Sequence, residues 1–443
     1  MKIQLSEHFT YKKLIKFTIP TIIMMIFTSI YGIVDGIFVS NCIGSEAFAA
    51  INLIMPVLMI LGAVGFMIGT GGSAIVSKTM GEGQKEKANQ YFSMLIYLLI
   101  ISGVILTIIG TIFMKPLAIM LGAEGEMLNY CVIYGTTSLI ALTAFLLQNA
   151  FQSFLVVAER PAMGLRVSII VGITNMVLDF LFIYVLEMGV FGAALATGIS
   201  QVVGAVIPLA YFTKENDSPL RLIKTKFELK PILKTCTNGS SEMLTNISMS
   251  LVNMLYNMQL IKYAGANGVV AYGIIMYVGF IFIGTYLGYS IGSAPIIGYH
   301  YGAENKEELK NLLKKSLILV GITSLVMTIL AEILAKPLAS IFVSYDKELL
   351  KMTTMAIRLY SISYILSGFN IFASAFFTAL NNGLVSAVIS FLRTLVFQTS
   401  AILIFPLIWE LNGIWLAIVF AEALSLIISL IFLIKNRKKY QYA

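Results

Sequence analysis

Long runs of apolar residues follow one another along the whole chain and are separated by short polar stretches. Each run has roughly 20 residues or more, and as an α-helix it spans the hydrocarbon core of a bilayer. A transmembrane β-barrel would instead show short strands of alternating polarity, and the sequence has none. The pattern predicts an all-α membrane protein with twelve transmembrane helices, near residues 14–39, 48–76, 91–113, 130–157, 165–186, 189–212, 236–262, 269–297, 312–335, 353–380, 384–408 and 411–434.

The second half of the chain repeats motifs of the first half. The tetrapeptide Lys-Pro-Leu-Ala occupies residues 115–118 and again residues 336–339, and residues 72–86 resemble residues 292–307. Such self-similarity indicates two homologous halves. Because each half has an even number of crossings, the repeats are expected to be parallel and related by an axis along the membrane normal.

The predicted domains follow from this repeat and from one polar interruption. An N-terminal six-helix lobe covers residues 1–212, a cytoplasmic linker covers residues 213–234, and a C-terminal six-helix lobe covers residues 235–443. The linker is the one substantial polar stretch, so no separate soluble domain is expected. The first apolar run is too long for a signal peptide and is expected to be retained as a helix.

Composition and charge agree with a membrane protein and exclude other classes. The chain is 58% apolar and 12% charged, with a mean hydropathy of +0.89. Basic residues cluster in alternate loops, and the positive-inside rule therefore predicts that both termini are cytoplasmic. This bias accounts for the net charge of +8, so nucleic acid is not needed to explain it. The three cysteines are scattered, without metal or redox spacing.

A few charged side chains inside the predicted helices mark the candidate functional site. A charge at mid-helix costs about 2.5–3.5 kcal/mol on insertion scales, so such residues are usually functional. Asp35 lies in the first helix, and Asp179 lies at a comparable depth in the fifth. Asn175 shares a helical face with Asp179, and Thr197 adds a hydroxyl in the sixth helix. This oxygen-rich group suits a proton or a small hard cation such as sodium.

These residues also have purely structural interpretations. A single intramembrane Asp can simply hydrogen-bond a neighbouring helix, and a Thr commonly bonds its own helix. Pro20 removes a backbone hydrogen bond from the first helix and is a potential hinge, although Pro near the start of a membrane helix is often passive.

Four other charged residues have roles that remain open between structure and function. Glu242 lies near the cytoplasmic end of the seventh helix, where it either caps the helix or contacts substrate or ion. Arg393 and Glu422 lie in the last two helices and are expected to pair with each other, a common way to tolerate buried charge. Glu332 is expected at the membrane interface.

The repeat, the twelve helices and the polar group in helices 1, 5 and 6 resemble the multidrug and toxic compound extrusion (MATE) transporters. The resemblance covers essentially the whole chain. Its most specific parts are residues 31–38, residues 175–179 and the Gly-Ala-Ala-Leu-Ala-Thr segment at residues 192–197. Within the family the chain is most similar to the bacterial DinF/MepA-like branch, which couples transport through the N-terminal lobe.

The resemblance implies a role for each residue of that polar group. It identifies Asp35, Asn175, Asp179 and Thr197 with the proton or sodium site, and Pro20 with the bending point of helix 1. The other main branch uses carboxylates in helices 7 and 10. This sequence departs from that second pattern, because its tenth helix has no acidic residue.

The resulting hypothesis is a secondary active exporter of organic cations and amphipathic drugs. Inward flow of protons or sodium would drive it, and the two lobes would rock to alternate access. Apart from the coupling ion, no cofactor is expected. Flexible Met and broad aromatic side chains suit a polyspecific cavity, although most such residues simply fill membrane helices. The predicted cavity residues are Met55, Met59, Gln148, Phe151, Glu242, Met254, Tyr256, Met276 and Tyr277.

Other functions are less well supported by the sequence. A flippase for lipid-linked saccharides should offer several cations to the phosphates, and only Arg393 lies at mid-membrane. A membrane enzyme or an ATP-driven pump would need catalytic or nucleotide motifs that the chain lacks. A passive channel would conduct without exchange. We expect a multi-pass protein of a bacterial plasma membrane that works as a monomer, since the two fused halves suffice.

Overall fold

The computed structural model describes residues 3–442, and these residues form helices and no β-strand. The elements of the first half are α1 (Tyr11–Cys42), α2 (Ser45–Gly81), α3 (Lys85–Met120), α4 (Gly125–Ile140), α5 (Leu142–Val157), α6 (Pro161–Asp179), the π-helix η1 (Phe180–Val185) and α7 (Gly189–Thr213). The elements of the second half are α8 (Leu229–Gly302), α9 (Lys306–Val343), α10 (Lys347–Ser361), α11 (Tyr364–Ala379), α12 (Gly383–Phe391), the π-helix η2 (Leu392–Phe397), α13 (Gln398–Ile404) and α14 (Pro406–Tyr440).

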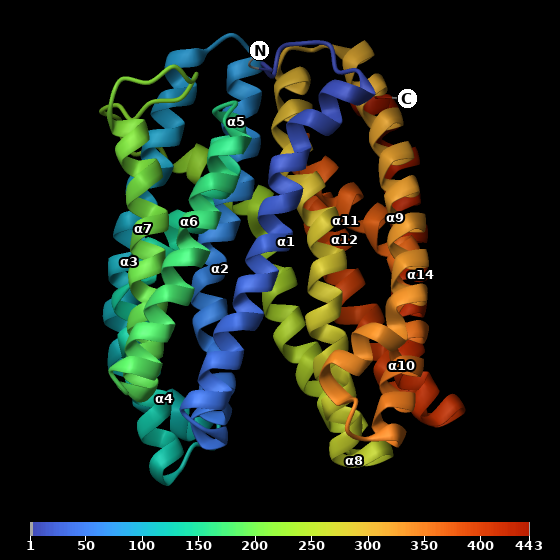
Figure 1. Ribbon diagram of the computed structural model, residues 1–443. Coiled ribbons are helices and arrows are strands. Elements are labelled where there is room, and N and C mark those ends of the chain that lie inside the picture. The colour runs from blue at the N-terminus through green and yellow to red at the C-terminus, as the bar shows by residue number, and fades with distance from the viewer. Residues whose placement is uncertain (1–2, 443) are drawn as a thin grey trace.

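The described residues supply twelve membrane crossings, as predicted. Nine helical segments are long and apolar enough to cross singly, and two bent pairs raise the number to 11. One of the nine is α8, whose backbone leaves the helical region at Gly265 (φ 60°, ψ −151°). Glycine adopts this conformation because it has no Cβ. The chain turns back there, so α8 is a hairpin of two membrane-length limbs that count as two crossings (Figure 1).

Four of the predicted crossings are broken or distorted along their length. α4 and α5 meet at 58°, and α10 and α11 meet at 46°. The fifth and eleventh crossings each contain a six-residue π-helix, η1 and η2. The breaks occur in the fourth and fifth crossings of each half, which agrees with an internal repeat. Such π-segments are frequent at functional sites.

The helices form two bundles that stand side by side (Figure 1). We call α1–α7 the N-lobe and α8–α14 the C-lobe. Both ends of the described chain lie at one end of the molecule, which we call the termini face; the lobes are close together there and diverge toward the opposite end (Figure 1). The non-helical connection between the lobes covers residues 214–228, because α7 ends at Thr213 and α8 already begins at Leu229. It is therefore shorter than the predicted linker.

Glycines allow the two lobes to touch backbone to backbone near the termini face. A Cβ added at Gly81 of α2 would overlap the carbonyl oxygen of Tyr299 in α8, and a Cβ added at Gly302 of α8 would overlap the carbonyl oxygen of Lys78 in α2. Gly81 and Gly302 occupy matching positions in the repeated motif. The repeat found in the sequence thus forms a symmetric contact, the seam, between α2 and α8.

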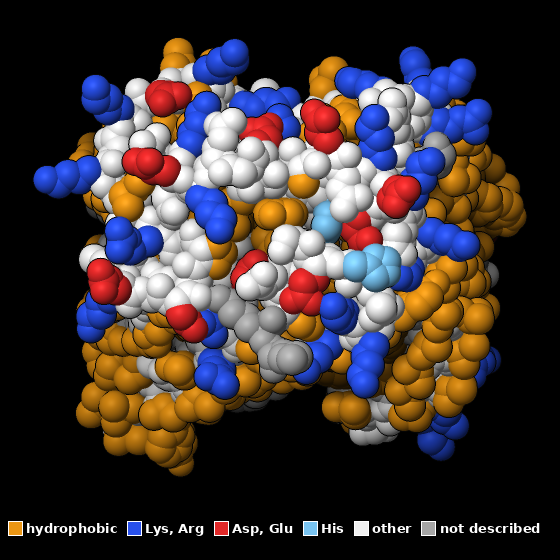
Figure 2. Space-filling view, turned by 90° about the horizontal axis from the view of Figure 1, so that it is seen from above, with side chains coloured by type: hydrophobic (Ala, Val, Ile, Leu, Met, Phe, Trp, Pro, Cys, Tyr) orange, Lys and Arg blue, Asp and Glu red, His pale blue; other side chains and the backbone are white. Residues whose placement is uncertain are grey.

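The molecular surface separates into a charged face and apolar flanks. Figure 2 shows Lys and Arg side chains spread over the termini face, with hydrophobic side chains on the flanks beyond its rim. On α3, for example, Ile105, Ile112 and Phe113 are each at least 50% exposed. Side chains of this kind are stable at a surface that contacts lipid, so the chain is a multi-pass membrane protein.

Candidate functional site: a carboxyl pair in the N-lobe

The two intramembrane aspartates of the N-lobe face each other. Asp35 projects from α1, and Asp179 is the last residue of α6, immediately before η1. Their carboxyl groups are within hydrogen-bonding reach of each other. Asp179 is fully buried, and Asp35 is half-buried with its Oδ1 shielded from solvent. The structure therefore brings together two residues that are 144 positions apart in the sequence.

The polar oxygens around this pair lack hydrogen-bond donors of good geometry. These buried atoms are Asp35 Oδ1, both carboxylate oxygens of Asp179, Asn175 Oδ1 and Thr197 Oγ1. Buried polar atoms nearly always have a partner, and leaving one without costs about 1–3 kcal/mol. Two ionised carboxylates only accept hydrogen bonds, so neither satisfies the other until one is protonated. The cluster is thus complementary to a proton or a small cation.

Two tyrosines that were not among the predicted site residues complete this cluster. Tyr134 on α4 is buried, and its hydroxyl lies close to Thr197 and to both carboxyl groups. Tyr31 lies one turn before Asp35 on α1, between that carboxyl group and the side chain of Gln148. The spacing of four residues to Asp35 is a signal that points to Tyr31. Tyr134 has no such signal, because α4 carries no other residue of the site.

The ligand atoms that the cluster offers limit which ions it can hold. Among residues 3–442 there is no group of three or more His, Cys, Asp or Glu side chains that could hold a metal ion. A cation here would have two carboxylates, with amide and hydroxyl oxygens as the remaining ligands. Oxygen ligands of this kind suit a hard ion, and two carboxylates balance one or two positive charges. A proton shared between the carboxyl groups, or a sodium ion, fits this set.

The predicted hinge residue lies in an unbroken helix. Pro20 is inside α1, which runs continuously from Tyr11 to Cys42. Since Pro has no backbone N–H, one hydrogen bond of the helix is missing at this turn. The bending role of Pro20 stays a prediction, but it has a physical basis in this weak point on the helix that carries Asp35.

The predicted cavity residues are divided between the lobe cores and exposed surfaces. Phe151 and Tyr256 are at most 1% exposed and belong to the cores of different lobes. By contrast, Met59 and Met254 are exposed. The other predicted positions are buried or half-buried, namely Met55, Gln148, Glu242, Met276 and Tyr277. A substrate cavity that included Phe151 or Tyr256 would therefore require the cores to rearrange.

The charged residues inside the C-lobe helices form a second group, in which Arg393 and Glu422 are hydrogen-bonded to each other. Arg393 Nη2 and Nε donate to Glu422 Oε1 at 2.7 and 2.9 Å, which confirms the predicted pairing. Asn370 Nδ2 donates to the other carboxylate oxygen of Glu422 at 2.7 Å. Glu242 in α8 lies close enough to Arg393 for an electrostatic interaction between the two side chains.

Comparison with known proteins supports a single family for the chain. The MatE family model matches residues 20–181 and 243–402, one segment in each lobe. Multidrug export protein MepA of Staphylococcus haemolyticus (strain JCSC1435) is 25% identical over 421 residues, which cover 93% of this chain and 89% of that protein. Multidrug export protein MepA of Staphylococcus aureus (strain MSSA476) is 25% identical over 438 residues, covering 96% and 94%.

Solved structures share the whole fold with this chain. A crystal structure of a MATE protein in complex with MaL6 superposes with a TM-score of 0.93 at 25% identity, covering 98% of both chains. An outward-facing conformation of a multidrug resistance MATE family transporter of the MOP superfamily has a TM-score of 0.92 at 26% identity, with the same coverage. The two-lobed arrangement is therefore that of known transporters.

Proposed function

The chain belongs to the MatE family, and from this membership we propose that it exports organic cations and amphipathic drugs in exchange for protons or sodium ions. It is a transporter and not an enzyme. Its curated relatives are named multidrug export proteins. The observation that carries the coupling part of the proposal is the pair of Asp35 and Asp179: among the described residues, Asp35 Oδ1 and both carboxylate oxygens of Asp179 are buried without a hydrogen-bond partner.

Competition for negative charge explains how ion and substrate are coupled. The pair lies in the protein interior, where the dielectric constant is low and charges interact strongly. When the pair is ionised, it therefore attracts a cationic substrate. A proton or sodium ion that binds the pair removes this attraction. Substrate and coupling ion therefore disfavour each other's binding, and this reciprocal effect is the thermodynamic requirement for exchange.

We assign the termini face to the cytoplasm of a bacterial cell. Lys and Arg are concentrated on this face (Figure 2), as the positive-inside rule expects for a cytoplasmic surface. With this orientation, the lobes are joined on the cytoplasmic side and diverge toward the exterior, which is the state that releases substrate outward. The similarity to an outward-facing MATE transporter supports this assignment. Two lobes within one chain suffice for alternating access, so we infer a working monomer.

A flippase for lipid-linked saccharides is the alternative from the same superfamily, and one contact disfavours it. A carrier of pyrophosphate-linked lipid needs cationic side chains that are available to phosphate. Arg393 is the mid-membrane candidate, and it already makes two hydrogen bonds to Glu422. We therefore retain drug export as the proposed function.

Transport by purified protein in liposomes tests this proposal. Ethidium, a fluorescent lipophilic cation, would be supplied with a proton gradient or a sodium gradient imposed separately. Ethidium movement that follows one gradient and stops when that gradient is collapsed establishes antiport and identifies the ion. Ethidium movement that neither depends on nor drives movement of protons or sodium would indicate a passive channel. Movement under no condition by folded protein would favour the flippase.

A further inference from the structure

The segment that precedes α1 reaches from one lobe to the other and back. In residues 3–10, the backbone N–H of Leu5 donates to Glu159 Oε1 at 2.9 Å, in the turn between α5 and α6 of the N-lobe. Four residues later, the backbone N–H of Phe9 donates to Glu308 Oε1 at 2.9 Å, at the start of α9 in the C-lobe. The chain then returns to the N-lobe as α1. The tip of the segment, His8 and Phe9, is therefore held by the C-lobe, and both its sides are anchored in the N-lobe.

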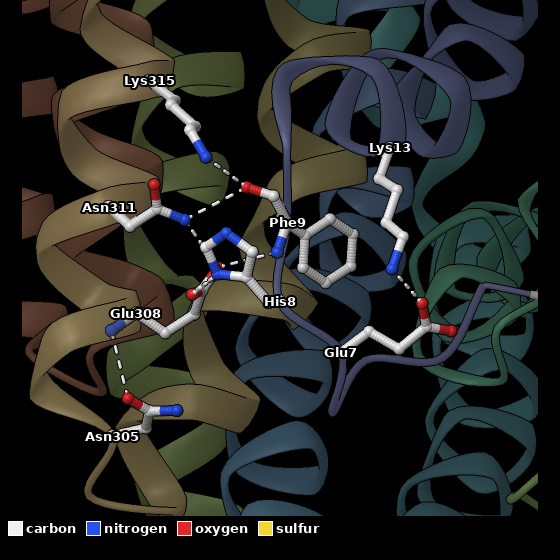
Figure 3. A network of polar contacts seen from close by, with 8 residues as sticks. All are labelled: Glu7, His8, Phe9, Lys13, Asn305, Glu308, Asn311 and Lys315. Atoms are coloured by element: carbon white, nitrogen blue, oxygen red, sulfur yellow. Dashed lines mark hydrogen bonds and ion pairs between the residues drawn. The ribbon is translucent and has the colours of Figure 1, made fainter.

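One face of α9 receives this tip (Figure 3). Glu308, Asn311 and Lys315 follow one another at spacings of three and four residues, which aligns them along the helix. Asn311 Nδ2 and Lys315 Nζ donate to the carbonyl oxygen of Phe9 at 3.1 and 2.6 Å. His8 Nδ1 lies 2.6 Å from Glu308 Oε2. Both backbone polar groups of Phe9 thus have partners in the C-lobe.

Apolar contacts reinforce these hydrogen bonds. The side chains of Leu5 and Phe9 are fully buried although they precede the first helix. The Phe9 ring packs edge-on against Phe17 of α1 at 6.0 Å and against His300 at the end of α8 at 6.5 Å. Phe9 therefore packs between α1 of the N-lobe and the end of α8 in the C-lobe.

Another ion pair of the same segment does not cross between the lobes. Glu7 Oε2 lies 2.6 Å from Lys13 Nζ, and both residues belong to the N-terminal end of the chain. The hydrogen bond from Lys13 lowers the pKa of the Glu7 carboxyl group. Because this pair can persist when the lobes separate, it provides a matched control for the contacts of His8 and Phe9 (Figure 3).

We propose that residues 3–10 form a latch that holds the cytoplasmic side closed, and that His8 and Phe9 leave α9 each time this side opens. The geometry requires this release. Since the segment is tied to the N-lobe at Leu5 and again at α1, movement of α9 away from the N-lobe must break the contacts at the tip. The inference rests on the alternating access of the proposed function. It assigns to residues 3–10 a role in setting the equilibrium between closed and open molecules.

Distance measurements between the lobes test the latch without any transport assay. Spin labels would be attached in a cysteine-free background after Lys87→Cys in α3 and Lys310→Cys in α9, two exposed positions on the termini face. Glu308→Ala and Phe9→Ala should each lower the ratio of closed to open molecules about tenfold or more. The first removes buried, charge-assisted hydrogen bonds, and the second removes the packing of a buried ring while the backbone hydrogen bonds of residue 9 remain possible. Glu7→Gln should leave the ratio at its wild-type value. Wild-type distance distributions in both folded latch variants would overturn the proposal.

A reversible cross-link provides the complementary test. In the variant that combines His8→Cys with Glu308→Cys, oxidation should join the segment to α9 and stop ethidium transport, and reduction should restore it. The single variant His8→Cys should transport under both conditions. Normal transport by protein shown to be cross-linked would mean that the segment does not leave α9, and the latch would be excluded. If even the wild type fails to move ethidium, the proposed substrate class is wrong, while the spin-label distances still decide the latch.

Discussion

At the scale of single residues, the carboxylates of the two lobes differ in what neutralises them. Glu422 in the C-lobe is held by Arg393 and Asn370, so its charge is already compensated. Among the described residues, Asp35 and Asp179 in the N-lobe have no basic partner and lie near each other and near neutral polar groups. A buried charge without a partner is costly in a membrane, and an exchangeable ion offsets this cost. This difference is the reason to assign ion coupling to the N-lobe.

Neutralising the N-lobe pair should therefore abolish coupling. We expect Asp35→Asn and Asp179→Asn to remove gradient-driven ethidium transport, with at least about a tenfold loss of initial rate, while the protein remains folded. The control is Glu332→Gln, because this half-buried carboxylate lies outside the pair: it accepts a hydrogen bond from Ser361 Oγ at 3.1 Å and approaches Arg358 at 3.9 Å. Transport is measured in liposomes at matched protein density. Wild-type rates in both aspartate variants would remove the pair from the mechanism.

The C-lobe pair should instead matter for stability. Glu422→Ala leaves the half-buried Arg393 without its hydrogen-bonded counter-ion, and removing one partner of such a pair typically costs about 3–5 kcal/mol. Glu332→Ala breaks a 3.9 Å contact with the partly exposed Arg358 and one hydrogen bond from Ser361, for which a smaller loss of about 1–2 kcal/mol is expected. Thermal unfolding of the two variants in the same detergent checks this ranking. Equal melting temperatures would show that the Arg393–Glu422 pair contributes little.

At the scale of helices, α8 joins the lobes near the termini face because glycines bring its backbone against α2. A Cβ at Gly239 in its first limb would overlap the carbonyl oxygen of Met67, whereas a Cβ at Gly273 in its second limb would meet nothing within 4 Å. Two chemically identical substitutions in α8 should therefore act in opposite ways.

Gly239→Ala should separate the lobes, and Gly273→Ala should not. In a helix interior, Gly→Ala favours folding by roughly 0.5–1 kcal/mol, because alanine loses less backbone entropy than glycine when the chain folds. We expect Gly273→Ala to gain about this much stability with unchanged distances between the lobes. Gly239→Ala should raise the population that is open at the termini face, as measured by the spin-label pair described above. The idea of a glycine-dependent seam fails if both variants keep the wild-type distances.

The sequence predicted the helices better than it predicted how they bend. Apolar runs report burial in lipid, so they located all twelve crossings. They cannot report the bend between α4 and α5 or the π-helix after Asp179, because hydrophobicity records burial in lipid and not the direction or the hydrogen-bond pattern of a helix. The pairing of Arg393 with Glu422 was predictable because lone buried charges are costly. Tyr134 and Phe9 were not, since each acquires its role only through tertiary contacts.

At the scale of the whole molecule, one helix connects the carboxyl pair to the lobe contact near the termini face. α1 carries Asp35 in its half away from the termini face, and near its start Thr18 and Thr21 contact α8 at Gly292. A change in α1 caused by ion binding at Asp35 can therefore reach the lobe contact through a continuous helix, with Pro20 as its weakest turn. Energetic coupling between two distant sites requires a structural element that has two conformations and contacts both sites. In this protein α1 is the candidate for that element.

The most direct test of ion-coupled export is to measure whether an ethidium gradient drives protons or sodium ions in the opposite direction. Liposomes that contain the protein and a trapped pH- or sodium-sensitive dye would receive an ethidium gradient with no ion gradient imposed. The account predicts that ethidium movement through the wild type drives protons or sodium in the opposite direction, and that Asp35→Asn abolishes this counterflow. Ethidium transport by the wild type without any counterflow, or equal counterflow in Asp35→Asn, would contradict the claim that the carboxyl pair couples export to an ion.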